Sequence, residues 1–521
     1  MRSLRSRRAR IALALLIAAI FAAGGALTYS LRTLEPRLHR WLTSTLARSL
    51  ESEIELASVN LGWMPLRLHA RGLTVRHHGR TDVPPLLVVQ SFSVDLRPAD
   101  FWSSTIDRVW VDGLEINIPP RDAATGKRRL PQQPAPSADD DNGDEPLFIR
   151  RLTASNARLA VIPREAGKNA RVWDIFELNL YNLGGSEPAS FQAALTNPIP
   201  YGKIDAHGHF GPWQSGEPGA SALAGEYTFV ADLGTIEGLG GHLNASGNMS
   251  GTIEQIVTRG KTETTDFRLT ELDGVSLPLH TTFDAIVDGT KGDVELKNVA
   301  IMLGKSTLTA SGVVEGTTGV KGKRIAVAVK SDAADLGELL QFVSKAGQPP
   351  ARGSLVIDAT LDLPQGSSPV LDRVVVQGTV RAERVHFASD AVQNKIDELS
   401  RRGQGRPEDE SIDEMASRMA TAFTLQKGVF TYRGLSFNVQ GADIRLNGTH
   451  SLKSRSVNLT GVVLLNATVS QTQTGFKSWL LKPFDPLFRK RGAGTRLAIK
   501  IAGTQDQPKV GLEIGRTLRG R

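Results

Sequence analysis

The sequence of 521 residues contains no cysteine, and aromatic residues make up only 6% of it. Without a thiol, a disulfide framework, a thiolate metal site and a cysteine nucleophile are all excluded. The 10 histidines show no metal-binding spacing such as HExxH, and the chain has no P-loop, dinucleotide fingerprint or GxSxG elbow. His207 and His209 share a face of one expected strand, but no third ligand is near them. We therefore expect no catalytic residue, no metal and no cofactor; scattered carboxylates leave a poorly marked enzyme as an alternative.

The formal net charge of +8 is concentrated at the two ends of the chain. Five arginines lie within residues 1–10, before the first apolar run, and a second basic cluster, Arg489 to Arg491, lies near the C-terminus. Between them the charges are mixed, with no basic helix and no stacking motif of aromatic and basic residues. This distribution argues against nucleic-acid binding.

Residues 11–31 form an uncharged apolar run, long enough to cross a bilayer as a helix of roughly 30 Å. The arginines of residues 1–10 predict that the N-terminus stays in the cytoplasm, which places everything after residue 31 outside it. We therefore expect a single-pass inner-membrane anchor with a periplasmic bulk. A cleaved signal peptide is the alternative, because small residues near Ala23 to Ala26 suit a peptidase.

Residues 32–118 predict an N-terminal unit with one or two helices and short strands. Apolar residues recur at helical spacing over 35–50, and the pattern then changes to short alternating strands separated by turns, over 54–59, 66–70, 73–75, 86–89, 92–96, 106–111 and 114–118. Residues 119–146 are rich in Pro and Asp and nearly free of apolar residues, so we expect a disordered linker there.

Residues 147–521 predict a long β unit. The clearest alternation runs from Leu355 to Leu363, and glycines inside the expected strands suit bends that curl a sheet. Two interruptions stand out: residues 391–423, interpreted as a helical insert of two helices around a loop, and residues 475–489, an aromatic and basic amphipathic segment. The fold class is therefore mainly β with a few helices.

The whole layout resembles the AsmA-like family, whose members are similar to bridge-type lipid transfer proteins. The resemblance is carried by the basic N-terminus with its apolar run, by LGWMPLRLHARGLTVRH and the paired strands ending in VWVDGLEINIP, by FTLQKGVFTYRGLSFNVQGADIRLNGTHSLKSRSVNLTGVVLL, and by KPFDPLFRKRGAGTRLAIKIAGTQDQPKVGL near the C-terminus. These segments cover both ends of the chain. The resemblance implies a long, curved antiparallel sheet that forms a gutter-like groove, apolar inside.

From this resemblance we expect a protein that binds phospholipid acyl chains and assists phospholipid transport or outer-membrane biogenesis, with outer-membrane or periplasmic protein partners. The alternative is a cell-envelope scaffold of closed β-sandwich domains that binds proteins, because a sandwich also produces alternating strands. The candidate groove residues are Tyr227, Phe229, Phe267, Leu269, Phe283, Val294, Leu296, Ile325, Val327, Leu355, Ile357, Leu361, Val457, Leu459, Leu497 and Ile499. The candidate membrane-surface residues are Trp479, Leu480, Phe484, Phe488, Arg489 and Lys490.

Overall fold

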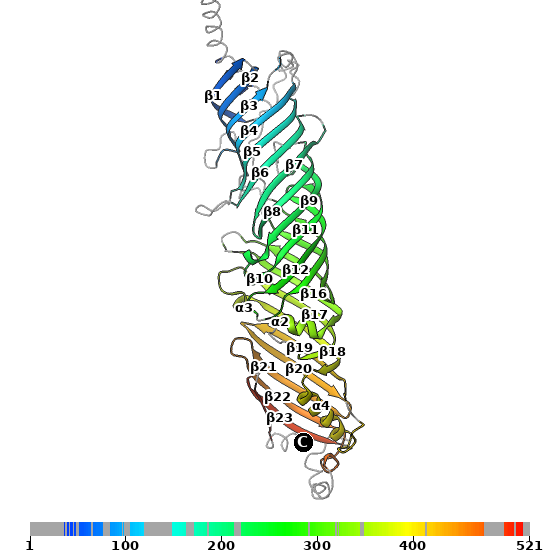
Figure 1. Cartoon of the computed structure of the whole chain (residues 1–521). Coiled ribbons are helices and arrows are strands. Elements are labelled where there is room, and N and C mark those ends of the chain that lie inside the picture. The colour runs from blue at the N-terminus through cyan, green and yellow to red at the C-terminus, as the bar shows by residue number, and fades with distance from the viewer. Residues whose placement is uncertain are drawn as a thin grey trace, which may run out of the picture. The chain divides into compact units, whose positions relative to one another are not determined.

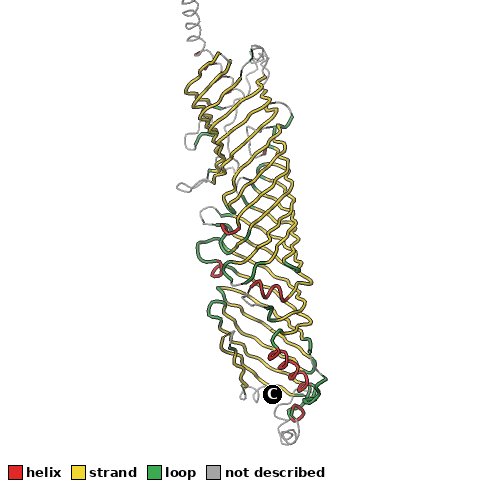
Figure 2. The backbone as a smooth tube through the Cα atoms, in the orientation of Figure 1, coloured by secondary structure: helices red, strands yellow, loops and turns green. Residues whose placement is uncertain are grey.

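The computed structural model traces the chain as a succession of strands with few helices (Figures 1 and 2). It describes residues 36, 39–40, 42–44, 46–47, 52–63, 66–76, 84–95, 97, 105–118, 148–162, 171–184, 187–212, 220–272, 274–289, 292–317, 320, 322–343, 348–411, 414–473, 494–504 and 507–513. All 24 strands of the described residues belong to one sheet. The expectation of a mainly β fold is confirmed.

The chain divides into two compact units, and the boundary passes through strands β8, β9 and β11 rather than through residues 119–146. The first unit contains β1 (Glu53–Trp63), β2 (Leu66–Arg76), β3 (Leu87–Asp95), β4 (Thr105–Ile118), β5 (Phe148–Val161), β6 (Arg171–Leu183), β7 (Ala189–Pro198) and most of β8 (Tyr201–Phe210). The two units share β9 (Ala222–Asp232) and β11 (His242–Thr252), whereas β12 (Gln255–Leu269) begins at the boundary and belongs to the second unit.

Strands β1 to β7 pair in chain order, antiparallel in every case but one. The exception is the parallel pair of β4 and β5, in which Thr105 lies opposite Phe148 and Ile118 opposite Val161. In a parallel pair the chain must return from the end of one strand to the start of the next. Here that distance is the length of β4, about 46 Å at 3.3 Å per residue. Residues 119–147 connect the end of β4 to the start of β5, so the segment predicted as a linker lies where this parallel pair needs a long connection. The structure of the segment itself lies outside the described residues.

The core of the first unit lies on one face of its strands. Leu68 and Val75, which are 3% and 1% exposed, belong to a cluster drawn from β1 to β6. The described residues between 36 and 47 are helical, as the sequence predicts, and Leu42 and Leu46 pack against this cluster. The ring of His39 forms a 2.7 Å hydrogen bond with the carbonyl of Leu56, which ties the helix to β1.

The first unit differs from the predicted short strands, because they join into longer ones. Residues 66–70 and 73–75 form the single strand β2, and residues 106–111 and 114–118 form β4. Gly72 and Gly113, at φ of 68° and 67°, interrupt the alternation without ending the strand. The pairing register is the same before and after both glycines. The neighbouring strands therefore change which residues face the core at the same place across the sheet.

The second unit contains the remaining strands, each paired antiparallel with the next from β12 to β24. They are β10 (Leu239–Gly240), β13 (Leu277–Val287), β14 (Val294–Leu303), β15 (Ser306–Glu315), β16 (Arg324–Asp335), β17 (Ala351–Leu363), β18 (Val375–Phe387), β19 (Ser417–Gln426), β20 (Val429–Val439), β21 (Ala442–Ser451), β22 (Ser456–Leu465), β23 (Thr495–Thr504) and β24 (Pro508–Leu512).

Helical turns in the second unit are few. They are η3 (Leu233–Thr235), α2 (Leu336–Val343), α3 (Val370–Arg373), α4 (Asp390–Gly403) and η4 (Ser470–Thr472). The predicted helical insert 391–423 is half wrong: α4 is its first helix, but the expected second helix is strand β19. Met419 and Phe423 fit helical spacing, yet Thr421 and Leu425 complete an alternation that pairs with β18.

No helix among the described residues is long and apolar enough to cross a membrane. The predicted anchor, residues 11–31, lies outside the described residues. The same holds for the amphipathic segment 475–489 and for its candidates Trp479, Leu480, Phe484, Phe488, Arg489 and Lys490.

Candidate functional site on the apolar face of the sheet

The sequence-predicted groove residues of β12 to β23 lie on one face of the sheet, hereafter the apolar face. Register carries this face from strand to strand: Leu296 lies opposite Gly312, Gly312 opposite Val327, and Val327 opposite Leu361. The same rows continue through β18 to β22 and reach Ile499 opposite Gly461. On these rows lie Phe267, Phe283, Val294, Leu296, Ile325, Val327, Leu355, Ile357, Leu361, Val457, Leu459, Leu497 and Ile499.

Three candidates are placed by alternation or a short pairing. Tyr227 and Phe229 occupy the less exposed face of β9, alternating with exposed positions. Leu269, at the end of β12, pairs with Leu239 of β10. Each of the three is half-buried.

Burial of the apolar face is uneven along the sheet. Among the described residues, the buried apolar clusters draw on β1 to β7 in the first unit and on the strands from β17 onward in the second. No residue of β9 to β16 belongs to them. On the apolar face of β13 to β16, Ala285 and Val299 are buried, but Phe283, Leu296 and Val327 are only half-buried. The middle strands therefore present apolar side chains that no described residue covers completely.

Two helices of the second unit cover part of the apolar face. Ile396 and Leu399 of α4 pack with the cluster around Phe437 in β20. Leu336 and Leu340 of α2 pack against the small cluster of β17 and β18. Both helices pack in the same way, because an amphipathic helix buries its apolar stripe against an apolar surface.

Helix α2 also reaches a strand five positions away in the sheet. The rings of Phe342 in α2 and Phe267 in β12 stack with centroids 5.7 Å apart. Beside them the amide of Val275 donates to the carbonyl of Gln341 at 3.0 Å. Since β12 and β17 are separated by four intervening strands, α2 bridges positions that the sheet order sets far apart.

A second bridge lies near α3. The carboxylate of Glu271, just after β12, accepts the amides of Val370 and Leu371 at 3.2 and 3.1 Å. Arg373, whose side chain is 14% exposed, pairs with Glu237 at 3.4 Å. A carboxylate at the first amides of a helical turn satisfies donors that lack partners inside the turn. Residues about a hundred positions apart in the chain are thus held together.

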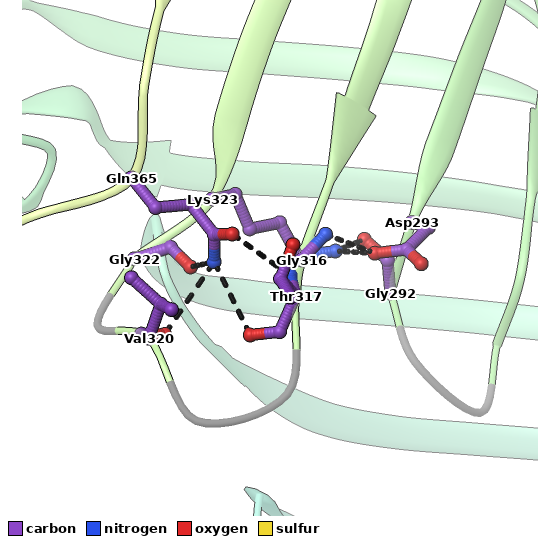
Figure 3. A network of polar contacts seen from close by, with 8 residues as sticks. All are labelled: Gly292, Asp293, Gly316, Thr317, Val320, Gly322, Lys323 and Gln365. Carbon is purple, nitrogen blue, oxygen red and sulfur yellow. Dashed lines mark hydrogen bonds and ion pairs between the residues drawn. The ribbon is translucent and has the colours of Figure 1, made fainter.

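The turns at one end of β13 to β17 are linked by a polar network (Figure 3). Asp293 accepts from the Lys323 ammonium at 2.8 Å and from the Gly316 amide at 2.9 Å, while Lys323 also contacts the carbonyl of Gly292. The Gln365 side chain accepts from the Thr317 amide at 2.9 Å and donates to the Gly322 carbonyl at 2.7 Å. The network fixes three successive turns at the end of these strands.

An aromatic row runs along the apolar face of β19, β20 and β21. Phe430 lies 5.8 Å from Phe423, 5.9 Å from Tyr432 and 6.4 Å from His450, measured between ring centroids. Burial raises the pKa of the Tyr432 phenol. The hydroxyl therefore remains protonated at neutral pH.

The opposite face of the sheet is polar. Its ion pairs include Lys330 with Asp358 at 3.2 Å, and a shallow cavity of about 350 Å³ opens between Asp358, Thr379 and Arg433, which share a row through Ala422. His207, one of the histidine pair of β8, faces Glu226 at 3.8 Å on the exposed side. Among the described residues, no three or more His, Asp or Glu side chains are grouped to hold a metal.

The sequence did not predict the contact of α2 with β12, the contact of α3 with Glu271, or the row of aromatic rings on β19 to β21. Leu336 and Leu340 are four residues apart, a helical spacing that was a signal for α2, but Phe342 does not share this spacing and nothing local indicates that it meets Phe267. No protein-family model, curated protein or solved structure matches this chain.

Proposed function

We propose that the apolar face binds the acyl chains of phospholipid, and that the protein is an inner-membrane-anchored periplasmic protein assisting phospholipid transport or outer-membrane biogenesis. The observation that carries the proposal is that Phe283, Leu296 and Val327, on the apolar face of β13 to β16, are only half-buried and lie outside every buried cluster of the described residues. Each methylene removed from water contributes about 0.8 kcal/mol. Ten buried methylenes thus supply about 8 kcal/mol without any residue-specific contact.

A gutter-like groove, as the resemblance to the AsmA-like family implies, requires the sheet to fold toward its apolar face. Glycines on that face support this curvature. A Cβ added at Gly312, Gly378 or Gly461 would lie 2.1, 2.3 or 1.8 Å from a carbonyl oxygen of the adjacent strand. In a flat sheet a Cβ stands clear of the neighbouring backbone. The two bridges between β12 and the turns beside β17 support the same curvature.

The periplasmic location rests on the sequence alone. Residues 11–31 are proposed as the anchor, and the arginines before them predict a cytoplasmic N-terminus. The non-transporting scaffold is the second candidate. It is favoured by the first unit, where Leu68 and Val75 are fully buried within a compact cluster.

Lipid extraction from the purified full-length chain tests the proposal. We expect phospholipid to co-purify with the wild type and to fall at least tenfold when Leu361 on the apolar face is replaced by lysine, because a buried charge is expelled from hydrocarbon. Thr360→Lys is the matched control, one residue away on the exposed face. Both variants should keep the wild-type circular dichroism spectrum. A lipid-free wild type, or equal lipid in both variants, would contradict acyl-chain binding and favour the scaffold.

A further inference from the structure

Polar side chains on the apolar face mostly find partners within the protein. The hydroxyls of Thr262 and Thr281 bond each other at 2.7 Å, and those of Ser331 and Ser417 donate to backbone carbonyls. Such internal bonds cancel the cost of burying a hydroxyl. A polar group on this face that lacks a partner therefore needs another explanation.

His450 is such a group. It lies on the apolar face of β21, opposite Phe430 and Val457, and its ring stacks on Phe430 at an interplanar angle of 17°. Its Nε2 atom is sealed from solvent without a hydrogen-bond partner, whereas Nδ1 is not sealed. The side chain as a whole is only half-buried. A neutral imidazole carries one donor and one acceptor, so this ring brings unused hydrogen-bonding capacity to an apolar surface.

Tyr432 also stacks on Phe430, from two residues further along the same strand. Its ring is parallel to that of Phe430 within 5°, and its cross-strand neighbour in β21 is Gly448, which has no side chain to cover it. Among the described residues its hydroxyl has no hydrogen-bond partner. Two polar side chains without a hydrogen-bond partner among the described residues thus stack on one phenylalanine of this face.

Positive charge lies at the adjacent strand end. The turn between β19 and β20 carries Lys427, which has no ion-pair partner among the described residues, and Gly428 of that turn accepts the amide of Leu452 at 2.8 Å. The next residue, Lys453, pairs with Asp372. Only two residues separate Lys427 from Phe430, so the lysine stands just before the strand that carries Phe430 and Tyr432.

We propose that Tyr432, His450 and Lys427 together bind the phosphate-ester end of a phospholipid whose acyl chains lie along the apolar face. The assignment rests on the proposed function, because it presumes acyl chains on that face. Phosphate and ester oxygens accept hydrogen bonds, which the phenol of Tyr432 and the accessible Nδ1 of His450 supply, and the anionic phosphate attracts the ammonium. Diacylglycerol offers the same chains without the phosphate, and inorganic phosphate offers the anion without the chains.

Lipid competition on the full-length chain in detergent tests the assignment. Native mass spectrometry measures the retention of dioleoylphosphatidylglycerol against dioleoylglycerol for the wild type, for Tyr432→Phe with His450→Phe, and for Lys427→Gln. We expect the double variant to lower the preference for the phospholipid about tenfold, the effect of losing hydrogen bonds to a charged group, while dioleoylglycerol is retained as before. Thr449→Val, on the exposed face beside His450, is the control and should leave the preference unchanged.

The outcomes separate the two proposals. An unchanged preference in the double variant overturns the headgroup site and leaves acyl-chain binding intact. A wild type that retains neither lipid overturns both. Inorganic phosphate in millimolar excess should not displace the phospholipid; displacement would reassign the site to free phosphate. Thermal unfolding followed by circular dichroism checks the fold, and we expect no loss of stability, because the substitutions remove an unsatisfied polar atom rather than a contact.

Discussion

Gly461 gives the sharpest test of how closely the strands approach on the apolar face. It lies in β22 between Leu446 of β21 and Ile499 of β23. A Cβ at this position would lie 1.8 Å from the carbonyl oxygen of Arg445, 2.8 Å from its carbon and 2.9 Å from the Cα of Leu446. Every one of these atoms is backbone. No side-chain rotation relieves the overlap.

The cost of Gly461→Ala follows from these distances. Carbon and oxygen atoms in ordinary contact are separated by at least 3.4 Å, so β21 has to move by about 1.6 Å. A shift of this size disrupts the hydrogen bonds of both flanking pairs. Overpacking typically costs about 1–3 kcal/mol and more where the backbone itself must move. We expect Gly461→Ala to destabilise the second unit by about 3 kcal/mol or more.

Urea unfolding of the full-length chain, followed by far-ultraviolet circular dichroism, measures this effect. Gly511→Ala is the matched control, because a Cβ at Gly511 in β24 meets nothing within 4 Å. Replacing a glycine where the backbone tolerates it stabilises by about 0.4–1 kcal/mol through the unfolded state, so the control should be neutral or slightly more stable. If the two variants unfold at the same urea concentration, the close approach inferred at Gly461 is refuted, and with it the curvature that the proposed groove requires.

Two further predictions concern contacts of the second unit. Phe342→Ala should destabilise by about 3 kcal/mol, since the buried ring that stacks on Phe267 is lost, and amide hydrogen exchange in α2 should rise; unchanged exchange would mean that the bridge contributes little. Hydrogen bonds from His242 lower the pKa of Asp266, so this carboxylate stabilises the fold above the unfolded value of 3.8 and loses the effect as the pH falls through its lowered folded value. Asp266→Asn should therefore flatten the acid limb of a stability-against-pH curve, and an identical limb would contradict the assignment.

The alternation of apolar residues predicted the face on which the candidate site lies. Leu355, Ile357 and Leu361 alternate with exposed residues in the sequence, and they share one face of β17 in the structure. This success has a simple cause. Successive side chains of a strand point to opposite faces, so a period of two identifies the buried side without any tertiary information.

Strand ends were predicted less well, for a reason visible at Gly72 and Gly113. Both glycines have positive φ and interrupt the alternation, and the sequence pattern was interpreted as a turn on each occasion. In the structure their partners across the sheet interrupt the alternation at the same row, so pairing continues. A single strand cannot reveal whether its neighbours share the interruption. Whether such a glycine ends a strand or only bends it therefore depends on the neighbouring strands, which the local sequence does not show.

The bridging contacts were beyond sequence reasoning altogether. Phe342 and Phe267 meet because of the path that the sheet takes between β12 and β17, and that path sums small rotations over every intervening pair. The strand β19 shows the same dependence on tertiary context. Met419 and Phe423 suit a helix or a strand equally, and pairing with β18 on one side and β20 on the other decides between them.

Alternation alone does not distinguish an open groove from a closed sandwich, but the apolar-face glycines do bear on that choice. In a sandwich the inner faces of two sheets lie about 10 Å apart, and large side chains must fill the space between them. A glycine on an inner face of a sandwich leaves part of that space unfilled. At Gly312, Gly378 and Gly461 the space that a Cβ would take is already filled by the backbone of the adjacent strand. The repeated glycines on the apolar face therefore favour the proposed groove, a single sheet folded toward that face, over a sandwich.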